Sequence, residues 1–168
     1  KNIQFSYFDS NKKILNNLNF KIKSGSVIAI FGKSGSGKTT IFDLLIKLYQ
    51  PTDGEILFNN ININKYNNSD WRAKISYVTQ EPILFTGTLR ENILLDRKYS
   101  DQQIIDVCLT ANLNDFLKNK DGLDTKIEDN GINLSGGQKR RIAIARSLIS
   151  DPFLVIIDEA TNSLDELS

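Results

Sequence analysis

One stretch constrains the fold more than any other. Residues 32–39 (GKSGSGKT) fit the pattern G-x-x-x-x-G-K-[ST] of a phosphate-binding loop. The apolar run before them, residues 28–31 (IAIF), is typical of a buried strand, and residues 40–48 (TIFDLLIKL) carry apolar side chains at helical spacing. Strand, loop and helix in this order are the context that the motif requires. A glycine-rich turn without a ligand is the weaker alternative.

The residue types in the loop explain its chemistry. Small residues let the backbone curl so that several N–H groups point inward, beside the positive end of the helix that follows. We expect Lys38 to reach the β- and γ-phosphates of a nucleotide and the Thr39 hydroxyl to bind magnesium.

A second candidate lies near the end of the chain. Residues 153–157 (FLVII) predict a strand buried on both faces, and Asp158 and Glu159 follow it directly. Beside a phosphate loop, these carboxylates suit metal-assisted phosphoryl chemistry, with Asp158 holding magnesium and Glu159 polarising the attacking water. The alternative, a solvated helix-capping pair, is disfavoured by the presence of the phosphate loop.

Residues 134–138 (LSGGQ) open an amphipathic helix and predict a second anion site. A monomer with one nucleotide does not need two such sites. The basic residues 139–141 (KRR) in the first turn are unfavourable there unless an anion or an acidic partner is near.

Two further candidates are less specific. Tyr7, upstream of the loop, could stack on adenine, although from spacing alone a half-buried sheet tyrosine is favoured. Gln80 follows a predicted strand at 75–78, where ligands bind in open α/β sheets, so its amide could touch magnesium or a water. Read alone, Gln80 is more typical of a loop.

The remaining patterns place the other elements. Thr88 with Glu91 predicts a capping box at a helix start, and another helix is predicted from Ser100 to about Thr110. The stretch 85–134 lacks strand patterning and is interpreted as a mainly helical subdomain. Further predictions are strands at 3–8, 15–22 and 55–58, a polar surface loop at 62–70, and short helices at 71–74 and 113–117.

The amino-acid composition limits which class of protein this can be. The chain has 21 basic and 20 acidic residues, which gives no field to gather nucleic acid or anionic lipid. Its single cysteine, Cys108, lies in an apolar helical pattern and is expected in the core, consistent with a reducing compartment. No apolar run approaches the roughly 18 residues of a membrane span. The absence of methionine indicates a piece of a longer protein, and histidine is absent too.

Together these pieces resemble the ATP-binding domain of ABC transporters, over essentially the whole chain and in the family's order. The pentapeptide at 134–138 is the most specific element, because other phosphate-loop ATPases lack it. Tyr7 matches the aromatic residue that stacks on adenine in this family, so the resemblance favours stacking over a half-buried sheet tyrosine. The matching segments are the Walker A loop at 32–39, the Q-loop at Gln80, the LSGGQ signature at 134–138, the Walker B strand with its glutamate at 154–159 and the D-loop at 163–165.

The resemblance implies an α/β fold: a P-loop NTPase (RecA-like) core with an N-terminal antiparallel β portion and an inserted helical subdomain. The core would comprise residues 1–84 and 135–168, and the helical subdomain residues 85–134. Residues 80–93 are similar to the exporter branch. The stretch 125–131 departs from the exporter pattern T-x-V-G-E-R-G, which weakens the carry-over of its contact with the membrane domain. The family's switch histidine lies beyond the last residue given, which we interpret as truncation.

The family also implies partners and a mechanism. ATP and Mg²⁺ would bind between two such domains in a head-to-tail dimer, at the cytoplasmic face of a membrane, attached to transmembrane domains and without nucleic acid. The alternatives are a soluble ABC ATPase acting on DNA, ribosomes or cluster assembly, and a module that only binds nucleotide. The implied catalytic residues are Glu159, Gln80 and Lys38; the implied metal ligands are Thr39, Gln80 and Asp158; the implied nucleotide contacts are Tyr7, Gly32, Lys33, Ser34, Gly35, Ser36, Gly37, Lys38, Thr39, Thr40, Gln80, Ser135, Gly136, Gly137, Gln138, Asp158 and Asp165.

Overall fold

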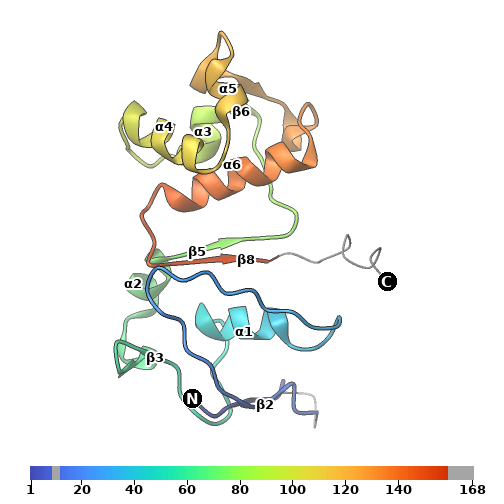
Figure 1. Ribbon diagram of the computed structural model, residues 1–168, viewed down its shortest axis with the longest axis vertical. Helices are drawn as coiled ribbons and strands as arrows, with labels where there is room; N and C mark the ends of the chain where they lie inside the picture. Colours follow the sequence, from blue (N-terminus) through green and yellow to red (C-terminus); the bar gives the residue numbers. More distant parts are fainter. Residues whose placement is uncertain (9–11, 159–168) are drawn as a thin grey trace. The chain divides into compact units, whose positions relative to one another are not determined.

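The computed structural model describes residues 1–8 and 12–158 of the 168-residue chain. The chain divides into two compact units, Lys1–Ala73 and Lys74–Ser168. Each unit has its own helices and strands (Figure 1) and its own cluster of buried residues.

The first unit begins with the expected antiparallel strands. β1 (Ile3–Phe5) pairs with β2 (Leu15–Leu18), with Ile3 opposite Leu18. A second antiparallel pair, β3 (Leu57–Phe58) and β4 (Ile61–Asn62), turns through two asparagines with positive φ, a conformation that asparagine tolerates better than most residues. The small core of this unit consists of Ile3, Phe5, Leu15 and Leu44.

The phosphate-loop helix is present, and the strand expected before it is not. α1 (Lys38–Leu45) starts at the lysine of the motif. Residues 28–31 form no strand, and Val27 and Phe31 are 98% and 78% exposed. The prediction of a buried strand here is therefore wrong for this structure. An isolated strand gains no stability without a neighbour to complete its hydrogen bonds, and the described strands of this unit pair only within their own hairpins.

The asparagine-rich stretch at 62–70, predicted as a surface loop, is more ordered than expected. It contains the 3₁₀ turn η1 (Ile63–Lys65) and the start of α2 (Asn68–Ala73). Ile63 is buried, and Trp71 donates its indole N–H to the carbonyl of Leu45 at 2.8 Å. Burial of Ile63 and the hydrogen bond from Trp71 to Leu45 thus hold this polar segment against α1.

The second unit contains a parallel strand pair. β5 (Ile75–Val78) pairs in register with β8 (Leu154–Ile157), confirming both predicted strands. The N–H of Asp158 donates to the carbonyl of Val78 at 2.9 Å and extends the ladder by one residue. Burial on both faces is not reached: Ile156 is 4% exposed and Ile157 is 40% exposed.

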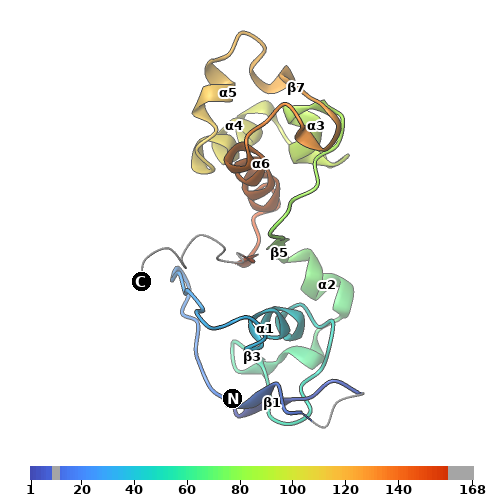
Figure 2. The same ribbon diagram turned by 90° about the vertical axis from the view of Figure 1, so that its right-hand side faces the viewer.

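Most of the second unit is helical, with the long α6 (Gly136–Leu148) packed against α3, α4 and β5 (Figures 1 and 2). Cys108 is buried in its core, as expected. Two short strands lie inside the stretch predicted to be without strands, β6 (Gly87–Thr88) paired with β7 (Lys126–Ile127). The other elements are α3 (Leu89–Leu94), α4 (Asp101–Thr110), α5 (Asn114–Lys118), η2 (Gly122–Asp124) and η3 (Asp129–Gly131).

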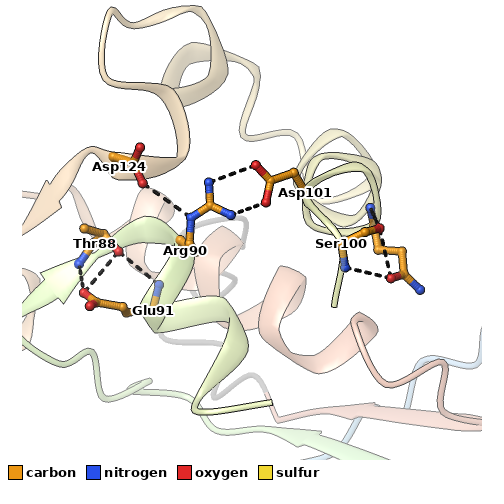
Figure 3. Close-up of polar contacts among 7 residues, drawn as sticks. Thr88, Arg90, Glu91, Ser100, Asp101 and Asp124 are labelled. Carbon is orange, nitrogen blue, oxygen red and sulfur yellow. Dashed lines mark hydrogen bonds and ion pairs between the residues drawn. The ribbon is translucent and has the colours of Figure 1, made fainter. Parts of the chain in front are cut away.

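Local polar contacts define where α3 and α4 begin (Figure 3). The predicted Thr88–Glu91 capping box is confirmed, and Ser100 with Gln103 forms another. Arg90 then joins these helix starts, because its guanidinium pairs with the carboxylate of Asp101 in the first turn of α4. Within the described residues, no helix has the length and apolarity to span a bilayer.

Candidate functional site

The phosphate loop curls through a tight turn before α1. The N–H of Ser36 donates to the carbonyl of Lys33 at 3.1 Å, and Gly35 within this turn has φ +75°. Gly37, the N-cap of α1, has φ +91°. Glycine adopts this left-handed region without steric strain, so the sequence places its glycines where the backbone needs them.

Glycine is also needed because neighbouring atoms leave no room for a side chain. A Cβ at Gly32 would lie 2.6 Å from Ser36 Oγ, and one at Gly37 would lie 2.9 Å from Leu15 Cδ2 and 3.0 Å from Ile14 Cγ2. One end of the loop therefore closes on itself, and the other end rests against β2.

Lys38 lies over this loop. Its Nζ donates to the carbonyls of Gly32 at 2.6 Å and Lys33 at 3.0 Å. The first amides of a helix have no intrahelical partner, so α1 offers N–H donors at the same place. An ammonium, free amides and small exposed residues together fit a polyphosphate. Thr39 is exposed at this helix start, so its hydroxyl is accessible to a magnesium ion.

Tyr7 lies beside the same helix. Its hydroxyl is 3.0 Å from Thr40 Oγ1, and its ring makes edge-to-face contacts with Phe5 and Tyr49. The ring is 36% exposed. The structure thus brings Tyr7 and the phosphate-loop helix together within one unit, while its stacking on adenine stays a prediction.

The signature segment forms an open helix start in the second unit. The N–H of Ser135 donates to Gln138 Oε1 at 2.8 Å, and the N–H of Gln138 donates to Ser135 Oγ at 3.2 Å. This capping box leaves the Ser135 hydroxyl proton available for another acceptor. Ser135, Gly136 and Gly137 are all exposed, and no atom lies within 4 Å of a Cβ built at Gly136.

A basic side chain lies along the first turn of α6. Arg141 Nη1 would lie 3.4 Å from a Cβ at Gly137, so its guanidinium extends back toward the helix start. Its Nε is buried and has no hydrogen-bond partner among the described residues. The expectation that an anion or an acidic partner lies near this turn stays a prediction.

The carboxylate and amide candidates follow the two parallel strands. Asp158 comes directly after β8, and Gln80 lies exposed in the bend after β5. Oxygen ligands of these types suit Mg²⁺. Glu159 and Asp165 lie outside the described residues. The described residues contain no group of three or more histidine, cysteine, aspartate or glutamate side chains arranged for a metal ion.

Two side chains near these candidates were missed from the sequence. Tyr77 donates its hydroxyl to Asp158 Oδ2 at 2.9 Å. Arg146 of α6 donates to the carbonyl of Ile83 at 2.8 Å and to that of Asn92 at 2.7 Å. Burial, and to a lesser degree the charge of nearby Arg97, lowers the pKa of Arg146. Both contacts depend on strand register and helix packing, which residue spacing does not reveal.

The assigned residues are thus divided between the two units. Lys38 and Thr39 lie in the first unit, whereas Gln80, Ser135 and Asp158 lie in the second. Each unit presents a complete local arrangement: a phosphate loop with its lysine in one, and an open signature helix with a strand-end carboxylate in the other.

Comparisons with known proteins identify the family of this chain. The ABC transporter family model matches residues 15–162. A protein of Rickettsia bellii named as an export ATP-binding/permease protein is 44% identical over 170 residues, which cover 100% of this chain and 30% of that protein. ABC transporter B family member 2 of Dictyostelium discoideum is 43% identical, over 98% of this chain and 12% of that protein.

A solved structure is similar over nearly the whole chain. It is that of a bacterial Atm1-family ABC exporter with ATP bound, with a TM-score of 0.83 and 36% sequence identity, covering 98% of this chain and 29% of that one. The chain therefore spans less than a third of the length of these relatives. It belongs to the ABC transporter family, and within that family it is an ATPase domain of the exporter type.

Proposed function

We propose that this domain binds ATP with Mg²⁺, pairs head to tail with a second ATP-binding domain, and hydrolyses the nucleotide to power export through attached membrane-spanning domains. The observation that supports the proposal is the presence of two glycine-rich helix starts suited to an anion, the closed loop before α1 and the open Ser135 start of α6. One nucleotide in one domain needs only the first. The second is explained if it serves a nucleotide held by a partner.

Each group then has a defined task. The loop amides and Lys38 Nζ bind the phosphates, and the Tyr7 ring stacks on adenine. Thr39, Gln80 and Asp158 would hold Mg²⁺, which would supply positive charge against the phosphate oxygens. Glu159 accepts a hydrogen bond from the attacking water and orients it toward the γ-phosphate.

Hydrolysis couples to movement through the signature. Ser135, Gly136 and Gly137, with Gln138 fixing the cap, donate to the γ-phosphate of the partner's nucleotide, and Asp165 lies at the same interface. The closed pair persists only while the γ-phosphate contacts both domains. Its loss lets the domains separate, and the attached membrane domains convert that separation into alternating access.

Export by a membrane protein is supported by the names of the relatives and by residues 80–93. In that segment Ile83 and Phe85 are 65% and 54% exposed, an apolar surface suited to contact with another domain. We place the domain at the cytoplasmic face of its membrane, because ATP is available there. The transported substrate is selected by membrane segments and is not read from this chain.

Glu159→Gln in the full chain tests the proposal. The variant keeps the size of the side chain and removes its basicity, so ATP should still bind while the ATPase rate falls by about 10²–10⁴-fold. Glu55→Gln, outside the proposed site, is the control and should hydrolyse ATP like the parent. Equal ATPase rates for Glu159→Gln and the parent would overturn the assigned role.

A further inference from the structure

Tyr77 makes a contact that has no role in the function proposed above. Its phenolic O–H donates to Oδ2 of Asp158 at 2.9 Å, from β5 to the end of β8. We propose that Tyr77 is a positioning residue, which fixes the orientation of the Asp158 carboxylate and leaves its other oxygen available to hold a magnesium ion. The inference rests on the proposed role of Asp158 as a metal ligand.

The strand pair determines which residues can make this contact. Side chains alternate between the faces of a strand. Ser76 donates its hydroxyl to the carbonyl of Ser147 on α6 at 2.7 Å, so Ser76 lies on the face that packs against α6. Tyr77 therefore lies on the opposite face, away from the signature helix.

The register brings Asp158 to the same face. Tyr77 is paired with Ile156, and Asp158 follows two residues later, with its N–H still bonded to the carbonyl of Val78 at 2.9 Å. Two strand residues span about 6.7 Å. A tyrosine is long enough to bridge that distance with its terminal hydroxyl, whereas a serine or valine at position 77 is not.

In this contact, Tyr77 hydrogen-bonds a proposed metal ligand without binding the metal itself. A carboxylate can accept several hydrogen bonds, so one oxygen can remain with Tyr77 while the other binds a metal or its water. Groups that hydrogen-bond a metal-binding carboxylate orient it, and their removal typically weakens metal affinity by about 10–100-fold. In the proposed function, the phosphates are bound by the loop at residues 32–39, so nucleotide binding without metal does not depend on Asp158.

Tyr77→Phe removes the donor and keeps the ring. We would measure thermal stabilisation of the full chain by a fixed ATP concentration while MgCl₂ is titrated, with Glu159→Gln present so that no turnover occurs. The Mg²⁺ midpoint should rise by about tenfold. ATP binding in EDTA should stay unchanged, and the melting temperature without ligand should fall by only about 2–4 °C, because one partly buried hydrogen bond is lost. Tyr99→Phe, in the same unit, is the matched control and should not move the midpoint.

Asp158→Asn separates this inference from the proposed function. If Asp158→Asn raises the Mg²⁺ midpoint and Tyr77→Phe leaves it within twofold of the parent, the positioning role is overturned and the metal assignment stands. If neither substitution moves the midpoint, Asp158 is not a metal ligand, and both the inference and that part of the proposed function are overturned.

Discussion

At the scale of single residues, glycine geometry decides whether the phosphate loop forms. Gly37 combines φ +91° with side chains of Ile14 and Leu15 within 3.0 Å of where a Cβ would be placed. Gly25 has a similar φ of +73° and open space around it. The two positions therefore separate backbone strain from steric contact.

Gly37→Ala should destabilise the chain by about 2–4 kcal/mol, because left-handed strain and a clash with β2 act together. Gly25→Ala should lose only about 1–2 kcal/mol, from strain alone. Urea denaturation of both variants measures the difference. Equal losses would mean that the contacts with Ile14 and Leu15 relax freely.

Motif residues were the part of the site that could be predicted from the sequence, because their roles are local. Lys38 returns to the carbonyls of its own loop, and Ser135 caps its own helix. Tyr77 and Arg146 could not be predicted, because their partners lie 81 and 54 residues away in the chain. Such contacts follow from register and packing, which no single motif contains.

At the scale of elements, capping boxes fix three helix starts among the described residues: those of α3, α4 and α6. Only the first uses a titratable group. The Glu91 carboxylate accepts hydrogen bonds from the backbone N–H of Thr88 at 2.7 Å and from its hydroxyl at 3.1 Å, and these bonds lower the pKa of Glu91.

The pKa of Glu91 is lower in the folded state than in the unfolded state, where it is about 4.3. The cap therefore contributes its full stability above the unfolded pKa, and this contribution is lost as the pH falls through the folded-state pKa. Glu91→Gln should keep the cap and remove this dependence. Denaturant titrations from pH 7 to pH 3 should therefore show parent and variant converging in acid. Gln103→Glu, at the equivalent position of α4, should introduce the same pH dependence of stability. If the stability of Glu91→Gln and that of the parent fell in parallel with pH, the mechanism would be contradicted.

Arg146 joins α6 to α3 and to the irregular segment before β6 through carbonyl groups. It bonds the carbonyls of Ile83 and Asn92, and its guanidinium lies 5.7 Å from the centre of the Phe85 ring. Arg146→Lys keeps the charge but cannot reach both carbonyls, so about 2 kcal/mol of stability should be lost in urea denaturation.

Arg72→Lys is the exposed control for Arg146→Lys. Arg72 also bonds two carbonyls, those of Ile46 and Lys47, but it is exposed. Arg72→Lys should lose clearly less stability, because water can hydrate the freed carbonyls. A loss as large as that of Arg146→Lys would show that burial is not the reason.

Helices were easier to predict than strands for a physical reason. The start of α4 at Ser100 is decided by side chains within three residues of it, and the helix ends at Thr110 as predicted. The apolar run at 28–31 had the composition of a strand, but a strand also needs a partner at the correct distance. Composition cannot supply that partner, so this prediction failed while the locally capped helices were correct.

At the scale of the whole molecule, the important fact is that the phosphate loop and the signature belong to different units of one chain. The signature start is exposed, capped from within and free of side chains at Gly136. A helix start with open amides is suited to an anion brought by a partner. The proposed head-to-tail dimer would supply such an anion, and a capping residue makes it testable.

Ser135→Asp should abolish ATP-driven dimerisation without unfolding α6. Aspartate is as good an N-cap as serine, so Gln138 keeps its acceptor, but its negative charge repels a γ-phosphate arriving from the partner. Ser100→Asp is the matched control, because Ser100 and Gln103 form the same capping box on α4. With Glu159→Gln present to stop turnover, light scattering in saturating MgATP should show monomers for Ser135→Asp and dimers for Ser100→Asp. A dimer of undiminished affinity for Ser135→Asp would mean that no partner phosphate meets this helix start.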